Sequence, residues 1–99
     1  MMVNATRITV HPETRTELTQ TIDRLLGPIK HVKGCRTVRF YLDAADENSW
    51  LLMSEWETES DLANYFHSND FAVLRGAITT LSVSSSDSSA LVTSYASRP

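Results

Sequence analysis

Residues 54–71 constrain the fold of this chain more than any other segment. An alternating stretch ends at Trp56, Thr58 can begin a short helix, and Ser68 can begin a second helix soon after it. Threonine and serine are favoured at helix starts because their side-chain oxygens accept hydrogen bonds from free N–H groups of the first turn. Asp61, three residues after Thr58, approximates a capping box. This segment therefore predicts a strand followed by two helices, which can place aromatic groups around one pocket.

Alternation with a period of two predicts four strands. They cover residues Thr6–Val10, about 35–43, about 50–57 and 90–96. The polar residues 43–49 are expected to form a turn that joins the two middle strands into an antiparallel hairpin. In the second strand one face carries Val38, Phe40 and Leu42, and the other carries Thr37, Arg39 and Tyr41.

Apolar residues at helical spacing predict three helices. Gly27 and Pro28 are expected to end the first helix, since glycine and proline interrupt helical patterns. Leu62 and Phe66 form one face of the short second helix. The serine-rich residues 82–89 are too polar to pack, so we expect a loop there. The apolar stripes of the first and third helices consist of Leu18, Ile22, Leu25 and Ile29, and of Phe71, Leu74, Ile78 and Leu81.

The resulting order, β-α-β-β-α(α)-β, predicts an α+β, ferredoxin-like domain with an antiparallel sheet that spans residues 1–99. Both faces of the third strand are apolar, because Leu51 and Met53 oppose Trp50 and Leu52. Helices can cover only one of these faces, and an uncovered apolar face commonly marks an interface. We therefore expect a homodimer, with two sheets packed face to face as a dimeric α/β barrel.

Composition and motifs exclude several classes of function. The net charge of −3 and the lack of a basic run argue against nucleic-acid binding. No apolar run is long enough to span a membrane. The lone Cys35 and an N-terminus unlike a signal peptide predict a cytoplasmic protein. Metal-ligand spacings and nucleotide-binding motifs are missing, so no metal or other cofactor is expected.

The chain resembles the antibiotic-biosynthesis-monooxygenase superfamily. The resemblance rests on Gly34-Cys35 before a strand, on Ser54-Glu-Trp56-Glu at a strand end, and on Ser68-x-x-Phe71 at a helix start. It covers most of the chain, from about Thr6 to Tyr95. Members of this superfamily form dimeric α/β barrels. Some oxidise phenols or quinols without metal or flavin, and some relatives degrade heme.

Two positions depart from the pattern that this resemblance implies. Many members carry a histidine nine residues after the strand-ending tryptophan, where this chain has Tyr65. Heme-degrading relatives use a histidine of this region as the iron ligand, and His67 lies about 200° further around a helix. Oxygenases of aromatic polyketides carry an asparagine where Leu52 stands. These departures favour neither heme nor a polyketide as the substrate.

The candidate site residues have alternative interpretations. Trp56 is either one wall of a substrate cavity or a core residue that fixes a helix to the sheet. Tyr65 is either a hydrogen-bond donor or acid, or an amphipathic rim residue. His67 is either a general base or a solvated side chain. Arg39 and Tyr41 either bind an anionic oxygen or lie in the dimer barrel. We assign catalytic roles to Tyr65, His67 and Arg39 and substrate binding to Trp56, Phe66, Tyr41 and Phe40.

The sequence therefore leads to two functional hypotheses. The first is a homodimeric monooxygenase without a prosthetic group, acting on a small electron-rich aromatic compound such as a quinol or phenol. Such a substrate becomes a strong reductant once it loses a proton, so a dry pocket, a base and an oxyanion-binding group suffice. The second hypothesis is a non-catalytic dimeric barrel that binds a small hydrophobic ligand or a protein partner. Heme degradation is a less favoured third hypothesis.

Overall fold

The computed structural model describes residues 1–91, and the elements follow the expected β-α-β-β-α-α-β order. The strands and helices, in chain order, are β1 (Met2–Val10), α1 (Arg15–Lys30), β2 (Cys35–Leu42), β3 (Ser49–Trp56), α2 (Glu59–Phe66), α3 (Asn69–Leu81) and β4 (Ser82–Leu91). The predicted ferredoxin-like fold is confirmed. The first strand is longer than predicted, because it begins at Met2 rather than at Thr6.

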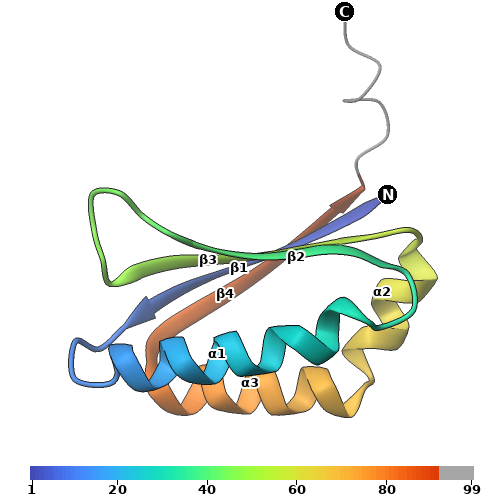
Figure 1. Ribbon diagram of the computed structural model, residues 1–99. Coiled ribbons are helices and arrows are strands. Elements are labelled where there is room, and N and C mark those ends of the chain that lie inside the picture. The colour runs from blue at the N-terminus through green and yellow to red at the C-terminus, as the bar shows by residue number, and fades with distance from the viewer. Residues whose placement is uncertain (92–99) are drawn as a thin grey trace, which may run out of the picture.

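The strands form one antiparallel sheet in the order β2-β3-β1-β4. The helices lie on one face of this sheet, with α1 and α3 side by side and α2 at one end (Figure 1). Strands β2 and β3 form the expected hairpin. The first strand lies in the interior of the sheet, between β3 and β4, and every second side chain of it faces the helix layer.

The first helix does not end at Gly27 and Pro28 as predicted. It continues to Lys30, and Pro28 lies inside its last turn. Proline removes one helical hydrogen bond, but the following Ile29 is fully buried and its packing holds the turn in place. The buried stripe also differs at one position, because Leu26 lies in the core where Leu25 was expected.

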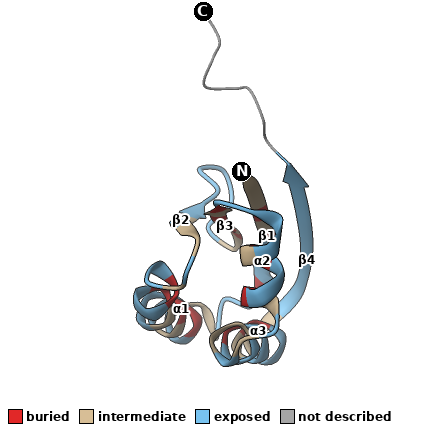
Figure 2. Cartoon of the chain, turned by 90° about the vertical axis from the view of Figure 1, so that its right-hand side faces the viewer, coloured by how far each residue is buried: buried red, intermediate tan, exposed pale blue. Residues whose placement is uncertain are grey.

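The prediction of a serine-rich loop at residues 82–89 is wrong. These residues belong to β4, which pairs antiparallel with β1 from Met2 opposite Leu91 to Val10 opposite Ser82. A strand is held by backbone hydrogen bonds, and an edge strand does not need apolar side chains. Figure 2 shows β4 as an exposed strand at the edge of the sheet. Of the predicted strand 90–96, only its first two residues fall within the described part of the chain, where they end β4.

Both predicted helix caps are present. The Thr58 side chain accepts a hydrogen bond from the backbone N–H of Asp61 at 3.0 Å, and Ser68 accepts one from that of Phe71 at 3.2 Å. These caps fix the starts of α2 and α3. In α2 the buried face differs from the prediction, because Leu62 is buried together with Tyr65, whereas Phe66 is only half-buried.

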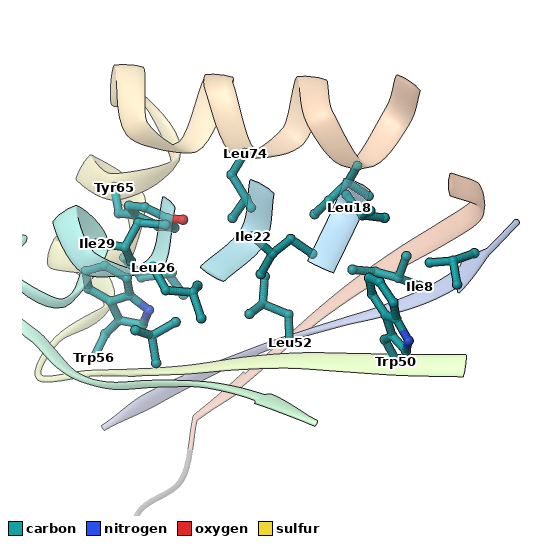
Figure 3. Close-up of a cluster of buried hydrophobic side chains, with 14 residues drawn as sticks. Ile8, Leu18, Ile22, Leu26, Ile29, Trp50, Leu52, Trp56, Tyr65 and Leu74 are labelled. Carbon is teal, nitrogen blue, oxygen red and sulfur yellow. The ribbon is translucent and has the colours of Figure 1, made fainter. Parts of the chain in front are cut away.

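The core lies between the helices and the sheet, and it is anchored by the two tryptophans of β3. Trp50 packs near Ile8 at one end, and Trp56 lies near α2 at the other (Figure 3). The indole N–H of Trp50 donates to the carbonyl of Glu47 at 2.9 Å. Each buried indole therefore has a partner for its only donor.

The opposite sheet face carries no helix in the part of the chain that the structure describes (Figure 1). Leu51 and Met53 on this face are half-buried, while Arg39 and Tyr41 are exposed. Within residues 1–91, no helix is both long and apolar enough to cross a membrane.

Candidate functional site

A cavity of about 170 Å³ lies between α3 and the sheet, and all four strands contribute residues to its lining. Apolar side chains of α3, Leu74 and Ile78, form its helix wall, and Leu52 of β3 contributes from the sheet. We call it the inner cavity. None of the buried α1 residues lines it, so it belongs to the α3 side of the helix layer.

The sheet wall of the inner cavity also carries polar side chains. Asn4, Thr6 and Ser54 point from the helix-facing side of β1 and β3, and all three are buried. Asn4 and Ser54 are direct neighbours across the two strands. Polar groups on the buried face of a sheet are unfavourable unless hydrogen-bonded. Ser54 has such a partner, since its hydroxyl oxygen accepts the indole N–H of Trp56 at 2.9 Å.

Tyr65 contributes the hydroxyl group at the α2 end of the cavity. Its ring stacks on Trp56, with ring centroids 4.7 Å apart, and meets the edge of Phe71 at 5.2 Å. The oxygen points into the layer between helices and sheet (Figure 3). The hydroxyl forms no hydrogen bond among the described residues, and because no fully buried polar atom there lacks a partner, it is accessible from the cavity. Burial raises the pKa of Tyr65 well above its ordinary value, and the negative charges of Cys35, Asp70 and Asp87 raise it further. The hydroxyl therefore stays protonated.

Two charged side chains mark the mouth of the inner cavity. Asp87 of β4 and Arg75 of α3 line both this cavity and an adjoining surface hollow of about 370 Å³, which we call the outer hollow. Asn4 and Phe71 also line both spaces, so the two share one boundary. The Thr6 hydroxyl donates to the Asp87 carboxylate at 2.5 Å. Within residues 1–91, Arg75 forms no salt bridge.

The predicted aromatic residues occupy different layers around this site. Tyr65 is buried rather than at the rim, and it is the predicted residue that faces the inner cavity. Trp56 is fully buried behind Tyr65 and is not part of the cavity lining. It supports the site by stacking against the Tyr65 ring. Phe66 lines the outer hollow. Phe40 packs against Trp50 at 4.8 Å, away from the cavity.

The structure does not bring His67, Arg39 or Tyr41 together with Tyr65. His67 caps the end of α2 and is exposed, outside both the inner cavity and the outer hollow. Arg39 and Tyr41 lie on the helix-free sheet face, where they line a shallow hollow with Met53. Their predicted roles stay predictions, but any such role needs a second site or a partner on that face.

Sequence reasoning did not assign to a site five of the polar residues that line the cavity: Asn4, Thr6, Ser54, Arg75 and Asp87. A signal was available for the first three, because they occupy positions on faces that otherwise carry residues such as Ile8 and Leu52. Asp87 could not be found once residues 82–89 were assigned to a loop. Only the pairing of β4 with β1 brings it beside Thr6.

The family model for the antibiotic biosynthesis monooxygenases matches residues 1–76 of this chain. The chain belongs to the antibiotic biosynthesis monooxygenase family. The match includes β1, β2, β3, α2 and the first part of α3, so it contains the residues that line the inner cavity except those of β4 and of the end of α3. The resemblance seen in the sequence motifs is thereby confirmed.

Several solved structures share the fold across most of the chain. Rv0793 from Mycobacterium tuberculosis is similar with a TM-score of 0.87 at 18% identity, and the match covers 96% of this chain and 97% of that one. SnoaB from Streptomyces nogalater, a cofactor-independent oxygenase, is similar with a TM-score of 0.82 at 16% identity. That match covers 92% of this chain and 91% of SnoaB. At these identities, the likeness establishes the fold.

A relative from Haloarcula marismortui carries the name "Putative heme-binding protein". It is 30% identical to this chain over 64 residues, which is 65% of the chain. The match covers 10% of the relative, so the chain spans about a tenth of that protein's length.

Proposed function

We propose that this protein is a cofactor-independent monooxygenase that acts on a small electron-rich aromatic substrate of the quinol or phenol type. The inner cavity carries the proposal. It brings apolar side chains of α3, polar side chains of the sheet and the hydroxyl of the buried Tyr65 together around one space. Apolar walls that bury a ligand and a few polar groups that orient it are the arrangement expected for binding a small aromatic molecule. Family membership and the SnoaB-like fold support the reaction class.

The proposed reaction needs no external reductant. In an anthrone-type phenol a ring-flanked CH₂ group becomes C=O, and in a quinol the product is the hydroxyquinone. In both cases one atom of O₂ enters the product, and the other leaves as water with two hydrogens of the substrate. All four electrons that reduce O₂ come from the substrate. The enzyme then has two tasks, which are to favour the deprotonated, electron-rich form and to exclude water from the reactive intermediate.

Two residues suit the first of these tasks. Tyr65 is held protonated by burial, so its hydroxyl can donate a hydrogen bond to an oxygen that gains negative charge. Arg75, at the cavity mouth, adds a positive charge on the same side as Phe71. We assign Tyr65 the role of oxyanion donor and Arg75 that of electrostatic stabiliser. Arg39, to which the sequence also led us to assign a catalytic role, lies on the other sheet face.

Oxygen consumption by metal-free protein tests the proposal. A panel of quinols and anthrone-type phenols is supplied in turn, and O₂ uptake is followed with an electrode against boiled protein. We expect uptake with at least one compound, with one O₂ consumed for each molecule oxidised. Tight binding of the panel without any O₂ uptake would instead favour the non-catalytic ligand-binding barrel.

Heme does not fit the residues of this cavity. The three histidines His11, His31 and His67 are exposed, and none lines the inner cavity or the outer hollow. Within residues 1–91, no group of potential ligands is arranged around a metal position. Tyr65 offers an oxygen atom, but its raised pKa disfavours the tyrosinate that binds ferric heme. The name of the Haloarcula relative therefore does not lead us to a heme function here.

We further propose that the protein is a homodimer through its helix-free sheet face. Leu51 and Met53 are half-buried on that face, and Tyr41 keeps 45% of its surface exposed. A second copy would remove this apolar area from water. Sedimentation at micromolar concentration tests the proposal, and a stable species of about one chain mass, 11.1 kDa, would contradict it.

A further inference from the structure

The boundary between the inner cavity and the outer hollow contains both a hydrogen-bond acceptor and a hydrogen-bond donor. Asn4 and Asp87 both line the two spaces. Asn4 belongs to β1, and Asp87 faces β1 from β4, opposite Thr6. Because Asn4 and Thr6 are two positions apart on one strand, they point to the same face, about 7 Å from each other.

The acceptor is the Asp87 carboxylate. Thr6 is buried, and its hydroxyl donates to one carboxylate oxygen, which fixes the orientation of the group. An ionised carboxylate only accepts hydrogen bonds, and it has more acceptor positions than one hydroxyl can fill. A ligand hydroxyl at the cavity boundary can therefore donate to the remaining oxygen.

The donor is the Asn4 amide. Asn4 is only 5% exposed, and its carbonyl oxygen accepts the Ser89 hydroxyl at 3.1 Å. Its NH₂ group forms no hydrogen bond among the described residues, and the side chain borders both the inner cavity and the outer hollow. An amide NH₂ that is accessible from a cavity can donate to an acceptor atom of a ligand or of water.

Charge at this boundary favours a neutral ligand. The Asp87 carboxylate and the Arg75 guanidinium both line it, so their charges offset each other. An anionic group placed against Asp87 is repelled at short range. A neutral hydroxyl group meets no such penalty.

We propose that Asp87 and Asn4 determine specificity, by selecting a neutral aromatic ligand that carries a hydroxyl group for Asp87 and a carbonyl-type oxygen for Asn4. This inference rests on the proposed function only in placing the ligand in the same cavity. Thr6 acts as a positioning residue, because it holds the Asp87 carboxylate and does not itself need to touch the ligand.

Paired probe ligands test the two contacts by calorimetric binding. The first pair is 1-naphthol and 1-methoxynaphthalene. Only 1-naphthol has a hydroxyl hydrogen with which to donate a hydrogen bond to Asp87. We expect the wild-type protein to bind 1-naphthol about 10- to 100-fold more tightly, the range expected for a hydrogen bond to a charged group. Asp87→Ala should remove this preference by weakening the binding of 1-naphthol while leaving the binding of 1-methoxynaphthalene unchanged. Asp23→Ala, which deletes an exposed carboxylate on α1, is the matched control and should keep it.

The second pair is 1-tetralone and tetralin, which differ in the carbonyl oxygen that Asn4 would bind. The wild-type protein should prefer the ketone by about 5- to 10-fold, as for a neutral hydrogen bond, and Asn4→Leu should abolish this preference. Equal affinities within either pair in the wild-type protein, or no binding of any probe, would overturn the inference. If Asn4→Leu fails to fold, the wild-type comparison still decides. Selective binding without O₂ uptake would refute the monooxygenase proposal and leave this inference standing.

Discussion

The two halves of the helix layer are built differently although they cover the same sheet. Under α1 the space is filled by Leu18, Ile22, Leu26 and Ile29, all apolar and buried. Under α3 the layer leaves the inner cavity, whose sheet wall carries Asn4, Thr6 and Ser54. Buried polar groups and empty space both reduce stability. We infer that the α1 half supplies most of the stability, and that the α3 half gives up some of it to hold a ligand.

The largest effect on stability is expected from truncating a side chain in the α1 half of the helix layer. Leu18 is 0% exposed, and Leu18→Ala removes buried methyl groups and leaves a cavity. Such changes reduce the free energy of unfolding by about 2–5 kcal/mol. Urea denaturation measures this loss, and Leu25→Ala, at a half-buried position on the same helix, is the milder control. If both variants lost the same free energy of unfolding, the α1 half would not be packed as described.

In the α3 half of the helix layer the largest effect should fall on activity rather than on stability. Tyr65→Phe removes the hydroxyl that points into the cavity and keeps the ring that stacks on Trp56. If Tyr65 donates to the developing oxyanion, O₂ uptake with a quinol substrate should fall about 100-fold. The melting temperature should change little, because the hydroxyl has no protein partner within residues 1–91. A variant that melts much earlier yet turns over normally would show that Tyr65 is a structural residue.

A third effect concerns the link between α1 and β2. Gly34 has a φ of +84°, and an added Cβ would collide with the side chain of Asp61 at the start of α2. Gly34→Ala should therefore destabilise the fold by about 1–3 kcal/mol. The matched control is Gly27→Ala in α1, where nothing lies near an added Cβ. It should stabilise by about 0.5–1 kcal/mol, because alanine favours helix more than glycine does.

The smallest effect is a dependence of stability on alkaline pH. The pKa of Tyr65 is raised in the folded state, mainly by burial, above its ordinary value of 10.0. A group of this kind stabilises the fold below its unfolded pKa, and this stabilisation is lost as pH rises above it. The melting temperature should therefore fall as pH increases beyond about 10.

The control for this pH experiment removes a second titrating group. Burial also raises the pKa of Cys35, which gives a fall of the same sign. Both proteins should therefore carry Cys35→Ala. In that background, Tyr65→Phe should show a shallower fall above pH 10 than the protein that keeps Tyr65. Identical slopes would mean that Tyr65 is not buried as described.

Sequence patterns predicted the fold well where side-chain periodicity and backbone pairing agree. Alternation identified β2 and β3, and the hydroxyls of Thr58 and Ser68 identified the starts of two helices. The patterns failed for β4, because its serines carry no apolar signal and its pairing with β1 is set by long-range contacts.

The same reason explains why the site was predicted only in part. Tyr65 and Phe66 lie on a helix whose cap and period are local properties of the sequence. Asp87 reaches the site only through the pairing of β4 with β1. Arg39 and Tyr41 were credible candidates, but their strand positions face away from the helices.

Mapping a bound aromatic probe by amide chemical shifts tests the central claim most directly. The protein is titrated with 1-naphthol, and the backbone ¹H–¹⁵N shifts are followed for every assigned residue. We predict saturating shifts at Asn4, Thr6, Tyr65, Arg75 and Asp87, which surround the inner cavity and its mouth, with small shifts along α1. Saturating shifts confined to Arg39, Tyr41 and Met53 on the helix-free face would contradict the assignment of function to the α3 half.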